Sequence, residues 1–486
     1  MDTYYHLLTG WGFIQAGGYS GWDFWQYAPA GRAHIYPPFF HILLALIFKS
    51  GLNRIITAKL LETVMPVIVL CVIWNFVKKH YTDRLAFLTL FGVNLSFSFY
   101  ASLSNYLPAS LSIVLGFLAL DAFLKEKFLK PSLLLGLCFY THIGMSWFFF
   151  ITIMACGLFD QRYRRPGLVI CAGALILSIP ILWHQFAYLS HISFSEMRNE
   201  KYLSEFKPIN YLLALIALIK LWRKDKKYRV FLGFLVSSII FLPYPYRFFS
   251  AQGYLPIIFL SGLGLDLLLE GYSCKYPGRL NKSLMLLLLF LFLFFSPTIV
   301  LEKGLPDGTR PQNKIFLFDS ALTDIMFPLK NHRAASISYW LPSEYLATAK
   351  LITGNSQEGD IVYSKFNLVG VALASICGRP TANALLPEIL APQKLSPLLS
   401  SKIIIMPKDE AIEKFNLNAR KNNLLNIGEN KLFIIYKNLS STSKIDRRKA
   451  SVSIRMIILI LLVFAFLLFQ ADRIDRFFLK KFRSVP

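Results

Sequence analysis

Charged side chains and cysteines are scarce in this chain. Asp, Glu, Lys and Arg make up only 16% of its 486 residues, and the six cysteines are scattered. Such cysteines form neither a disulfide framework nor a metal-binding pattern. The scarcity of charge, together with the long apolar runs described next, excludes a soluble enzyme and a disordered protein. The apolar residues, 55% of the chain, occur in long uncharged runs. This composition predicts a helical protein that crosses a membrane several times.

Apolar runs close to the roughly 20 residues of a membrane-spanning helix recur along the sequence. They are residues 56–77, 84–101, 107–124, 131–141, 143–159, 167–186, 207–222, 228–244, 253–270, 282–300 and 453–470. We therefore predict about 11 spans. Thr141, His142 and Gly144 separate residues 131–141 from residues 143–159, so two short helices are expected there. Residues 37–49 are too short to cross the bilayer and predict a helix at its surface.

Acidic residues are outnumbered, 28 against 52 Lys and Arg, which gives a net charge of +24. The basic residues gather in alternate loops between the apolar runs, as in cytoplasmic loops of membrane proteins, so we expect no nucleic-acid partner. One alternating topology places these loops and the C-terminal tail in the cytoplasm, and residues 1–55 and 301–452 outside a plasma-type membrane. Met1 then lies outside, so a further span is expected upstream; the alternative is that the N-terminus translocates unaided.

The chain is expected to have four parts. Residues 1–55 form an external loop with a surface helix, and residues 56–300 form the multi-span region. Residues 301–452 predict a small external α/β domain, and residues 453–486 a final span with a basic cytoplasmic tail. Within the α/β domain we expect strands at residues 360–364 and 402–407, a helix at 367–376 that ends at Cys377-Gly378, and a hairpin at 424–437.

The first external loop carries an unusual combination of aromatic, glycine and charged residues. Asp2 and His6 are four positions apart, which places them on one helix face, and Gly17-Gly18 ends that helix. The loop then contains Trp22-Asp23, Gly31-Arg32 and Tyr36-Pro37-Pro38. Flat aromatic rings of this kind suit a sugar or an isoprenoid chain.

Ordinary structural roles compete with this interpretation. Asp2 is also a good helix cap, and Asp23 a good turn residue. Tryptophans such as Trp22 are common in the aromatic belt of a membrane interface.

The order Asp2, Tyr5-His6, Trp22-Asp23, Gly31-Arg32 and Tyr36-Pro37-Pro38 resembles the first external loop of GT-C membrane glycosyltransferases. It is most similar to the catalytic subunits of archaeal oligosaccharyltransferases. The resemblance covers about the first 100 residues and implies sugar transfer from a polyprenyl-phosphate donor at the outer face. It implies Asp2 as the base, oriented by His6, with Asp23 as a second carboxylate. Arg32 would help to bind the donor phosphate.

Other candidates come from the spans and their outer ends. Arg247, isolated in the loop 243–252, resembles the basic residue that GT-C enzymes place against a lipid phosphate; the alternative is an interfacial anchor. Glu62 lies within a span, where an acid is a functional candidate, although Lys59 is positioned to pair with it. His142 falls at the outer end of a span, where a lone histidine is commonly structural. The expected substrate-lining residues are Trp22, Tyr36, Glu62, Asn105 and His142.

Two features of the oligosaccharyltransferase pattern are missing. The second external loop carries Asn105 and no acidic pair, and the Trp-Trp-Asp-Tyr-Gly signature is absent. We therefore expect no metal site, although Mn²⁺ or Mg²⁺ remains an alternative.

The leading interpretation is thus a GT-C enzyme that uses a polyprenyl-linked sugar donor in the bilayer and a protein, glycan or lipid acceptor. The alternatives are a true oligosaccharyltransferase, a lipid or solute transporter or flippase, and a membrane scaffold. A transporter would place ionisable groups near the midplane of two related halves, and no such halves are detected.

Overall fold

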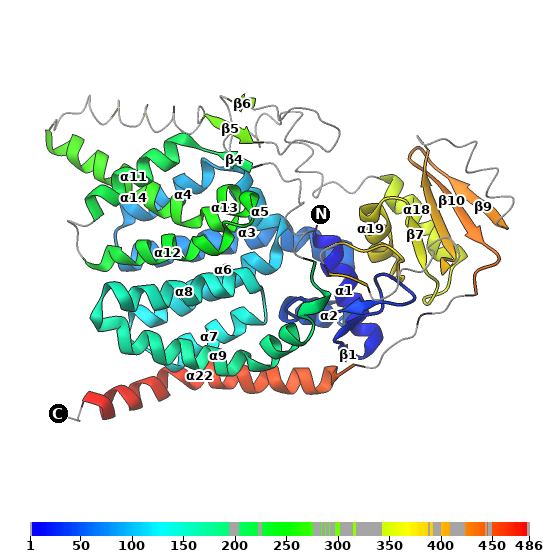
Figure 1. Ribbon diagram of the computed structural model, residues 1–486, viewed down its shortest axis with the longest axis horizontal. Helices are drawn as coiled ribbons and strands as arrows, with labels where there is room; N and C mark the ends of the chain where they lie inside the picture. The colour runs from blue at the N-terminus through cyan, green and yellow to red at the C-terminus, as the bar shows by residue number, and fades with distance from the viewer. Residues whose placement is uncertain are drawn as a thin grey trace. The chain divides into compact units, whose positions relative to one another are not determined.

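Figure 1 shows the computed structural model of the protein, which is mostly helical. It describes residues 2–193, 204–221, 226–275, 297–301, 314–316, 343–386, 389–391, 400–408, 423–442 and 450–483, with a few single positions between them. The chain divides into two compact units. The first unit consists of Met1–Leu61, Ile181–Met197 and Ile337–Ala465. The second unit consists of Glu62–Pro180, Arg198–Ser336 and Phe466–Pro486.

The second unit is built from helices. They are α4 (Asp83–Asn94), α5 (Phe97–Asn105), α6 (Leu107–Leu124), α7 (Leu129–Phe139), α8 (Ile143–Phe159), α11 (Pro208–Leu221), α12 (Val230–Ser238), α13 (Pro245–Ser250) and α14 (Leu255–Lys275). Parts of α3 (Arg54–His80), α9 (Arg164–Ala187) and α22 (Ile454–Arg483) also belong to it. A short sheet of β4 (Ser204–Phe206), β5 (Thr298–Leu301) and β6 (Lys314–Phe316) completes its described part.

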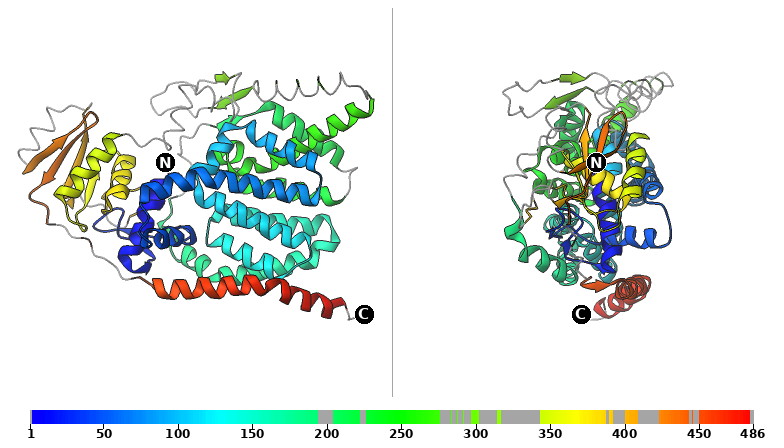
Figure 2. Two further views of the ribbon diagram at one scale, coloured as in Figure 1. Left: turned by 180° about the vertical axis from the view of Figure 1, so that it is seen from behind. Right: turned by 90° about the vertical axis from the view of Figure 1, so that its right-hand side faces the viewer.

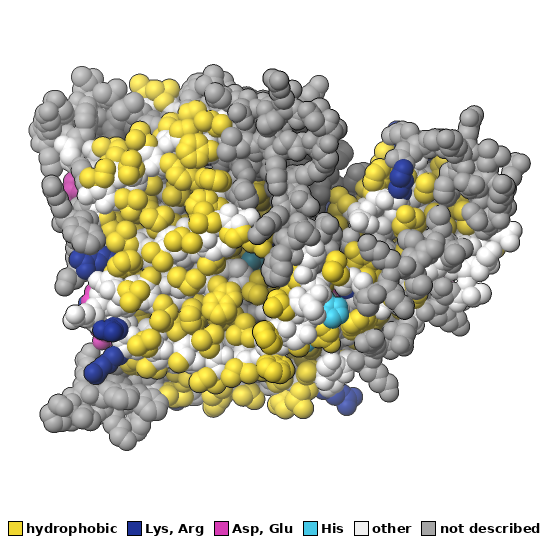
Figure 3. All heavy atoms as spheres, viewed as in Figure 1, with side chains coloured by type: hydrophobic (Ala, Val, Ile, Leu, Met, Phe, Trp, Pro, Cys, Tyr) yellow, Lys and Arg dark blue, Asp and Glu magenta, His cyan; other side chains and the backbone are white. Residues whose placement is uncertain are grey.

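The described residues include five helices that are long and apolar enough to cross a membrane. They are Arg54–His80, Leu107–Leu124, Gln161–Ala187, Gln252–Gly271 and Ile454–Arg476. The pair α4 and α5, bent by 85°, is a sixth candidate span. Apolar side chains cover much of the helical face that Figure 3 shows, as expected where lipid rather than water is the solvent. The helical membrane fold that the sequence predicts is confirmed.

Several predicted runs break into shorter helices. Residues 131–159 form two helices, α7 and α8, as expected, and the His142 side chain caps α8 by accepting from the Met145 N–H. The run 84–101, expected as one span, is the bent pair α4 and α5, because the Ser96 side chain caps a new helix at the bend. The predicted run 282–300 lies almost entirely outside the described residues.

Three of the basic segments meet at one end of the second unit. Lys79, in the last turn of α3, lies 2.9 Å from Asp121 near the end of α6. Lys127, in the next loop, lies 2.6 Å from Asp472 of α22. Helix ends that share ion pairs lie on the same side of a membrane, which agrees with the alternating topology; which side faces the cytoplasm stays a prediction.

The first unit contains the first loop and an α/β sheet domain. The loop has two helices, α1 (Asp2–Ala16) and α2 (Phe39–Lys49). Helix α1 ends before Gly17-Gly18 as expected, and α2 lies within the run 37–49, whose position at the membrane surface stays a prediction. Short strands pair β2 (Trp22–Asp23) with β3 (Arg32–Ala33), and β1 (Gly18–Tyr19) with β11 (Val452–Ser453).

The sheet domain has the strand order β7-β8-β10-β9. Its strands are β7 (Val362–Ser364), β8 (Ile403–Pro407), β9 (Leu424–Glu429) and β10 (Phe433–Asn438), which confirm the predicted strands and hairpin. Two helices pack on one face of this sheet (Figure 2), α18 (Ser343–Asn355) and α19 (Asn367–Cys377), and their apolar side chains form a core with the strands. Helix α19 ends as predicted, because Gly378 adopts the left-handed conformation with a φ of 66°.

Helix α19 also packs against the first loop. Val371 and Ala374 share a buried core with Leu8, Trp11 and Trp25. The loop that carries most of the candidate residues is therefore held on a folded domain rather than on a mobile tether.

Candidate active site

The candidate residues of the first loop lie around α1 and α2 in the first unit. Asp2 is the first residue of α1 and is half-buried, whereas the following turns of the helix are buried almost continuously. Such burial fixes the helix that presents the Asp2 carboxylate. A base needs this kind of positioning, but so does a simple helix cap, and the geometry of α1 is compatible with both.

His6, one turn after Asp2, belongs to a buried pair of histidines. Its Nδ1 lies 2.8 Å from Nε2 of His41 on α2, at hydrogen-bond distance. Tyr5, Tyr36 and Phe40 contact the His6 ring edge to face, with centroid separations of 5.1 to 5.5 Å. The His6 imidazole is thus held in one orientation by α2 and by its aromatic neighbours.

Sequence reasoning missed His34 and His41. The available signal was composition, since three of the eight histidines lie within the first 41 residues. Burial comes first, and the neighbouring His6 and His34 second, among the causes that lower the pKa of His41 well below its ordinary value. His41 is therefore neutral at pH 7 and donates or accepts one hydrogen bond to His6 without adding a charge.

Asp23 and Arg32, both predicted site residues, meet inside the first unit. Asp23 is fully buried, and its Oδ1 lies 2.6 Å from Nδ1 of His34. Its other oxygen, Oδ2, lies 3.7 Å from Nε of Arg32. The antiparallel pair β2–β3 sets this contact, because Asp23 is directly opposite Arg32 in the register.

The guanidinium of Arg32 is also fully buried. It donates hydrogen bonds to the carbonyl oxygens of Leu385, Leu386 and Ile389, and to Oε1 of Gln26. These contacts join the first loop to a segment more than 350 positions further along the chain. In this arrangement Arg32 and Asp23 hold the loop in place, and Nη1 and Nη2 of Arg32 donate to protein acceptors.

Trp22 and Tyr36 are half-buried around the same loop. The Trp22 indole donates to the carbonyl of Ala30 at 3.1 Å, and Tyr36 packs edge to face on Tyr5 and His6. The carbonyl of His34 lies 2.8 Å from Nε2 of His184, which fixes the loop from a second direction. Among the first-loop candidates, Asp2, His6 and Tyr36 thus gather at one end of α1, and Trp22, Asp23 and Arg32 at the β2–β3 ribbon.

The remaining candidates lie in the second unit. Arg247 is half-buried on α13, with its guanidinium carbon 5.3 Å from the centre of the Tyr244 ring. His142 is buried in the connection between α7 and α8. Burial, and then the positive charge of Arg247, lowers the pKa of His142 to about 3. The structure therefore brings Arg247 and His142 into one electrostatic neighbourhood.

Glu62 and Asn105 occupy different helices of the second unit. Glu62 is buried on α3, and Asn105 is half-buried at the last position of α5. Among the described residues, no group of three or more His, Cys, Asp or Glu side chains is arranged to hold a metal ion.

Comparisons with known proteins identify the fold. No protein-family model and no curated protein matches the sequence. Among solved structures, ArnT from Cupriavidus metallidurans bound to undecaprenyl phosphate is similar at 12% identity, over 90% of this chain and 97% of ArnT, with a TM-score of 0.49.

The oligosaccharyltransferase AglB from Archaeoglobus fulgidus also matches. In complex with an inhibitory peptide and a dolichol-phosphate it is 11% identical over 84% of this chain, with a TM-score of 0.52. In complex with Zn and sulfate it is 10% identical over 86% of this chain, with a TM-score of 0.53. This chain spans 65% of the archaeal enzyme. It therefore shares the fold of this archaeal oligosaccharyltransferase, the kind of protein that its first loop resembles.

Proposed function

We propose that this protein is a membrane glycosyltransferase that moves a sugar from a polyprenyl-phosphate donor to an acceptor on the extracytoplasmic face. The observation that carries the proposal is the first loop, in which Asp2 begins α1 one turn before the buried His6–His41 pair. This arrangement occurs in a chain with the GT-C fold. The structure of the archaeal enzyme that shares the fold contains a dolichol-phosphate, a lipid carrier of the proposed class.

The reaction assigns a task to each group. Asp2 accepts the proton of the acceptor hydroxyl or amide, whose oxygen or nitrogen forms the new bond to the anomeric carbon of the sugar. The bond between that carbon and the lipid phosphate breaks, and the phosphate leaves with the electron pair. The leaving phosphate needs its negative charge stabilised, and a guanidinium can do so by donating two parallel hydrogen bonds; Arg247 is the candidate residue for this task. We propose that these steps need no tightly bound divalent metal.

His6 is the positioning residue in this scheme. Held by His41 at 2.8 Å and by aromatic rings, its imidazole provides a fixed polar surface one turn from Asp2. In this scheme Asp23 and Arg32 hold the loop, because both are fully buried and lie against each other. Their direct participation, which the resemblance of the first loop implied, stays a prediction.

Replacement of Asp2 by Asn tests the proposal. Asn caps a helix as well as Asp does but cannot accept the proton, so the rate of polyprenyl phosphate release in proteoliposomes should fall by about 100-fold or more. The thermal midpoint should stay unchanged.

Asp83→Asn is the matched control, because Asp83 is also the first residue of a helix, α4, and is exposed. It should leave the rate unaltered. Full activity of Asp2→Asn would reduce Asp2 to a helix cap and remove the central support of the proposal.

A true oligosaccharyltransferase is the second candidate, favoured by the fold shared with AglB. The nature of the product separates the two. Transfer of a whole glycan to asparagine of an acceptor peptide would support the second candidate, whereas transfer of one sugar to another acceptor would support the first. A flippase would move the lipid without releasing polyprenyl phosphate.

A further inference from the structure

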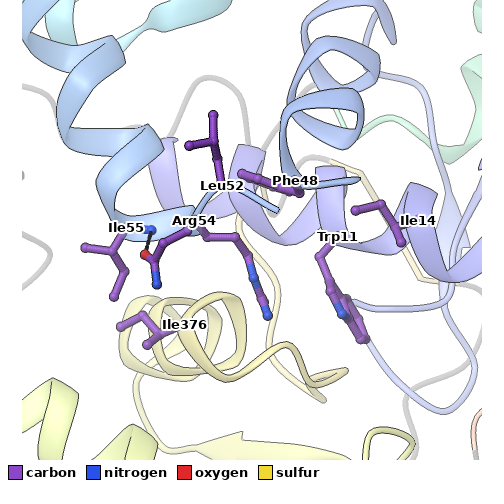
Figure 4. A pocket seen from close by; sticks show the side chains of 8 residues that line it. Trp11, Ile14, Phe48, Leu52, Arg54, Ile55 and Ile376 are labelled. Atoms are coloured by element: carbon purple, nitrogen blue, oxygen red, sulfur yellow. Dashed lines mark hydrogen bonds between the residues drawn. The ribbon is translucent and has the colours of Figure 1, made fainter. Parts of the chain in front are cut away.

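A cavity of about 330 Å³ lies in the first unit, and its lining includes neither Asp23 nor His6. Trp11 and Ile14 of α1, Phe48 of α2 and Ile376 of α19 form its apolar walls. Arg54, the first residue of α3, is its charged group, and Figure 4 shows the Arg54 side chain extending over α19 between Ile376 and Trp11. The cavity thus combines one guanidinium with an apolar lining.

Arg54 is half-buried without a carboxylate partner. Its Nη1 donates to the carbonyl of Ser375 at 2.8 Å, and no acid lies within ion-pair distance among the described residues. Arg379, a second cation whose charge acts on Arg54, is nearly buried and donates to the neutral oxygens of Ser356, Cys377 and Gly378. Glu358, an acid whose charge also acts on Arg54, is exposed to solvent. Two partly desolvated arginines whose hydrogen bonds, within the described part of the chain, go to neutral oxygens favour a bound anion.

The donors at this place belong to Arg54 rather than to the helix backbone. Asn53 caps α3, since its Oδ1 accepts from the N–H groups of Ile55 and Ile56 at 2.9 and 3.3 Å. These first-turn amides are therefore occupied. The Arg54 guanidinium makes only one hydrogen bond within the described part of the chain, so it retains donors for a ligand.

The position of the cavity identifies the kind of anion. Arg54 begins a helix that is long and apolar enough to cross the membrane, so its side chain lies at the membrane surface. Next to it, Leu52, Ile56 and Leu60 are 55%, 63% and 58% exposed. An anion that sits at headgroup depth beside an exposed apolar surface is a lipid phosphate with its chain in the bilayer.

We propose that this cavity binds the phosphate headgroup of an anionic membrane lipid. The Arg54 guanidinium holds the phosphate, and the hydrocarbon chain lies against the exposed residues at the start of α3. The lipid would stabilise the contact between α3 and α19, and so the attachment of the first loop to the sheet domain. The proposal does not depend on the proposed glycosyl transfer, because it concerns a separate cavity and is tested by binding alone.

The test measures lipid binding to the purified full-length protein in a neutral detergent. Phosphatidylglycerol is titrated while the thermal midpoint and the retained lipid are followed, and phosphatidylcholine with the same acyl chains serves as the comparison lipid. We expect saturable stabilisation by phosphatidylglycerol at concentrations at least tenfold below those that phosphatidylcholine needs. Arg54→Gln should weaken phosphatidylglycerol binding by about tenfold or more, and Arg54→Lys should restore it in part.

Two further variants separate charge from shape. Ile14→Trp fills the cavity and leaves Arg54 intact, so it should also lose lipid binding. Lys49→Gln removes an exposed charge at the end of α2, outside the cavity, and should behave as the wild type.

Equal binding of both lipids, or wild-type binding by Arg54→Gln, would overturn the proposal. The last experiment titrates inorganic phosphate at millimolar concentration. If it stabilises the protein as strongly as phosphatidylglycerol does, the cavity binds a free anion and the proposal of a lipid ligand is refuted.

Discussion

Asp23→Asn is the substitution that separates a structural from a catalytic role in the first loop. Asp23 is fully buried, with one oxygen 2.6 Å from His34 Nδ1 and the other 3.7 Å from Arg32 Nε. Asn preserves the shape and can still accept the His34 N–H. It removes the only charge shown to face Arg32 among the described residues, so the guanidinium stays buried without a counter-charge.

The size of the effect follows from this geometry. Removal of one partner from a buried ion pair costs about 3–5 kcal/mol. Arg32 keeps its bonds to three carbonyl oxygens and to Gln26, so we expect the lower end, about 3 kcal/mol. At about 2 °C per kcal/mol for a large domain, the thermal midpoint should fall by about 6 °C.

Thermal unfolding in detergent, followed by tryptophan fluorescence, measures this shift. Glu429→Gln is the matched control. Oε1 of the exposed Glu429 lies 3.3 Å from Nζ of Lys408, and the loss of such a surface ion pair should cost less than about 1 kcal/mol. An Asp23→Asn protein that melts with the wild type but has lost its turnover would refute the structural assignment and return Asp23 to the reaction.

Four further outcomes are expected. Arg247→Ala should strongly impair use of the lipid-linked donor and Arg247→Lys should restore it partly, whereas full rescue by Lys in donor-dependent kinetics would indicate an interfacial anchor. Burial lowers the pKa of His41, so below about pH 6.5 the unfolded state binds a proton that the folded state does not. The free energy of unfolding should therefore fall as the pH drops from about 6.5 to about 5. The fall should be smaller in His41→Phe, which lacks this titrating group. Cys377, buried and with its pKa raised to about 12, should react with an impermeant thiol reagent on intact cells only after mild denaturation, and Cys274 should not react; labelling of Cys274 alone would reverse the predicted orientation. Activity should survive a chelator, and complete loss that Mn²⁺ or Mg²⁺ restores would contradict the metal-free proposal.

The periodic and local features of the fold could be predicted from the sequence. Long apolar runs specify helices whose backbone groups are satisfied within the segment, and five of the predicted runs are long apolar helices in the described part of the chain. The strand at residues 402–407, the hairpin at 424–437 and the glycine that ends α19 depend on local pattern and local φ values, and all three are present. The bend between α4 and α5 escaped prediction because an apolar run does not reveal that Ser96 caps a second helix.

The sequence alone determined which residue types the first loop contains. Only the tertiary structure decided which of these side chains are buried and which groups they contact, because those contacts involve residues far away in the chain. His6 meets His41 across 35 positions, Arg32 reaches carbonyls more than 350 positions distant, and Arg54 contacts Ser375 on α19. A carboxylate such as Asp23 looks the same in the sequence whether it faces a substrate or a buried arginine; the desolvation and the neighbouring charge that distinguish the two exist only once the chain has folded.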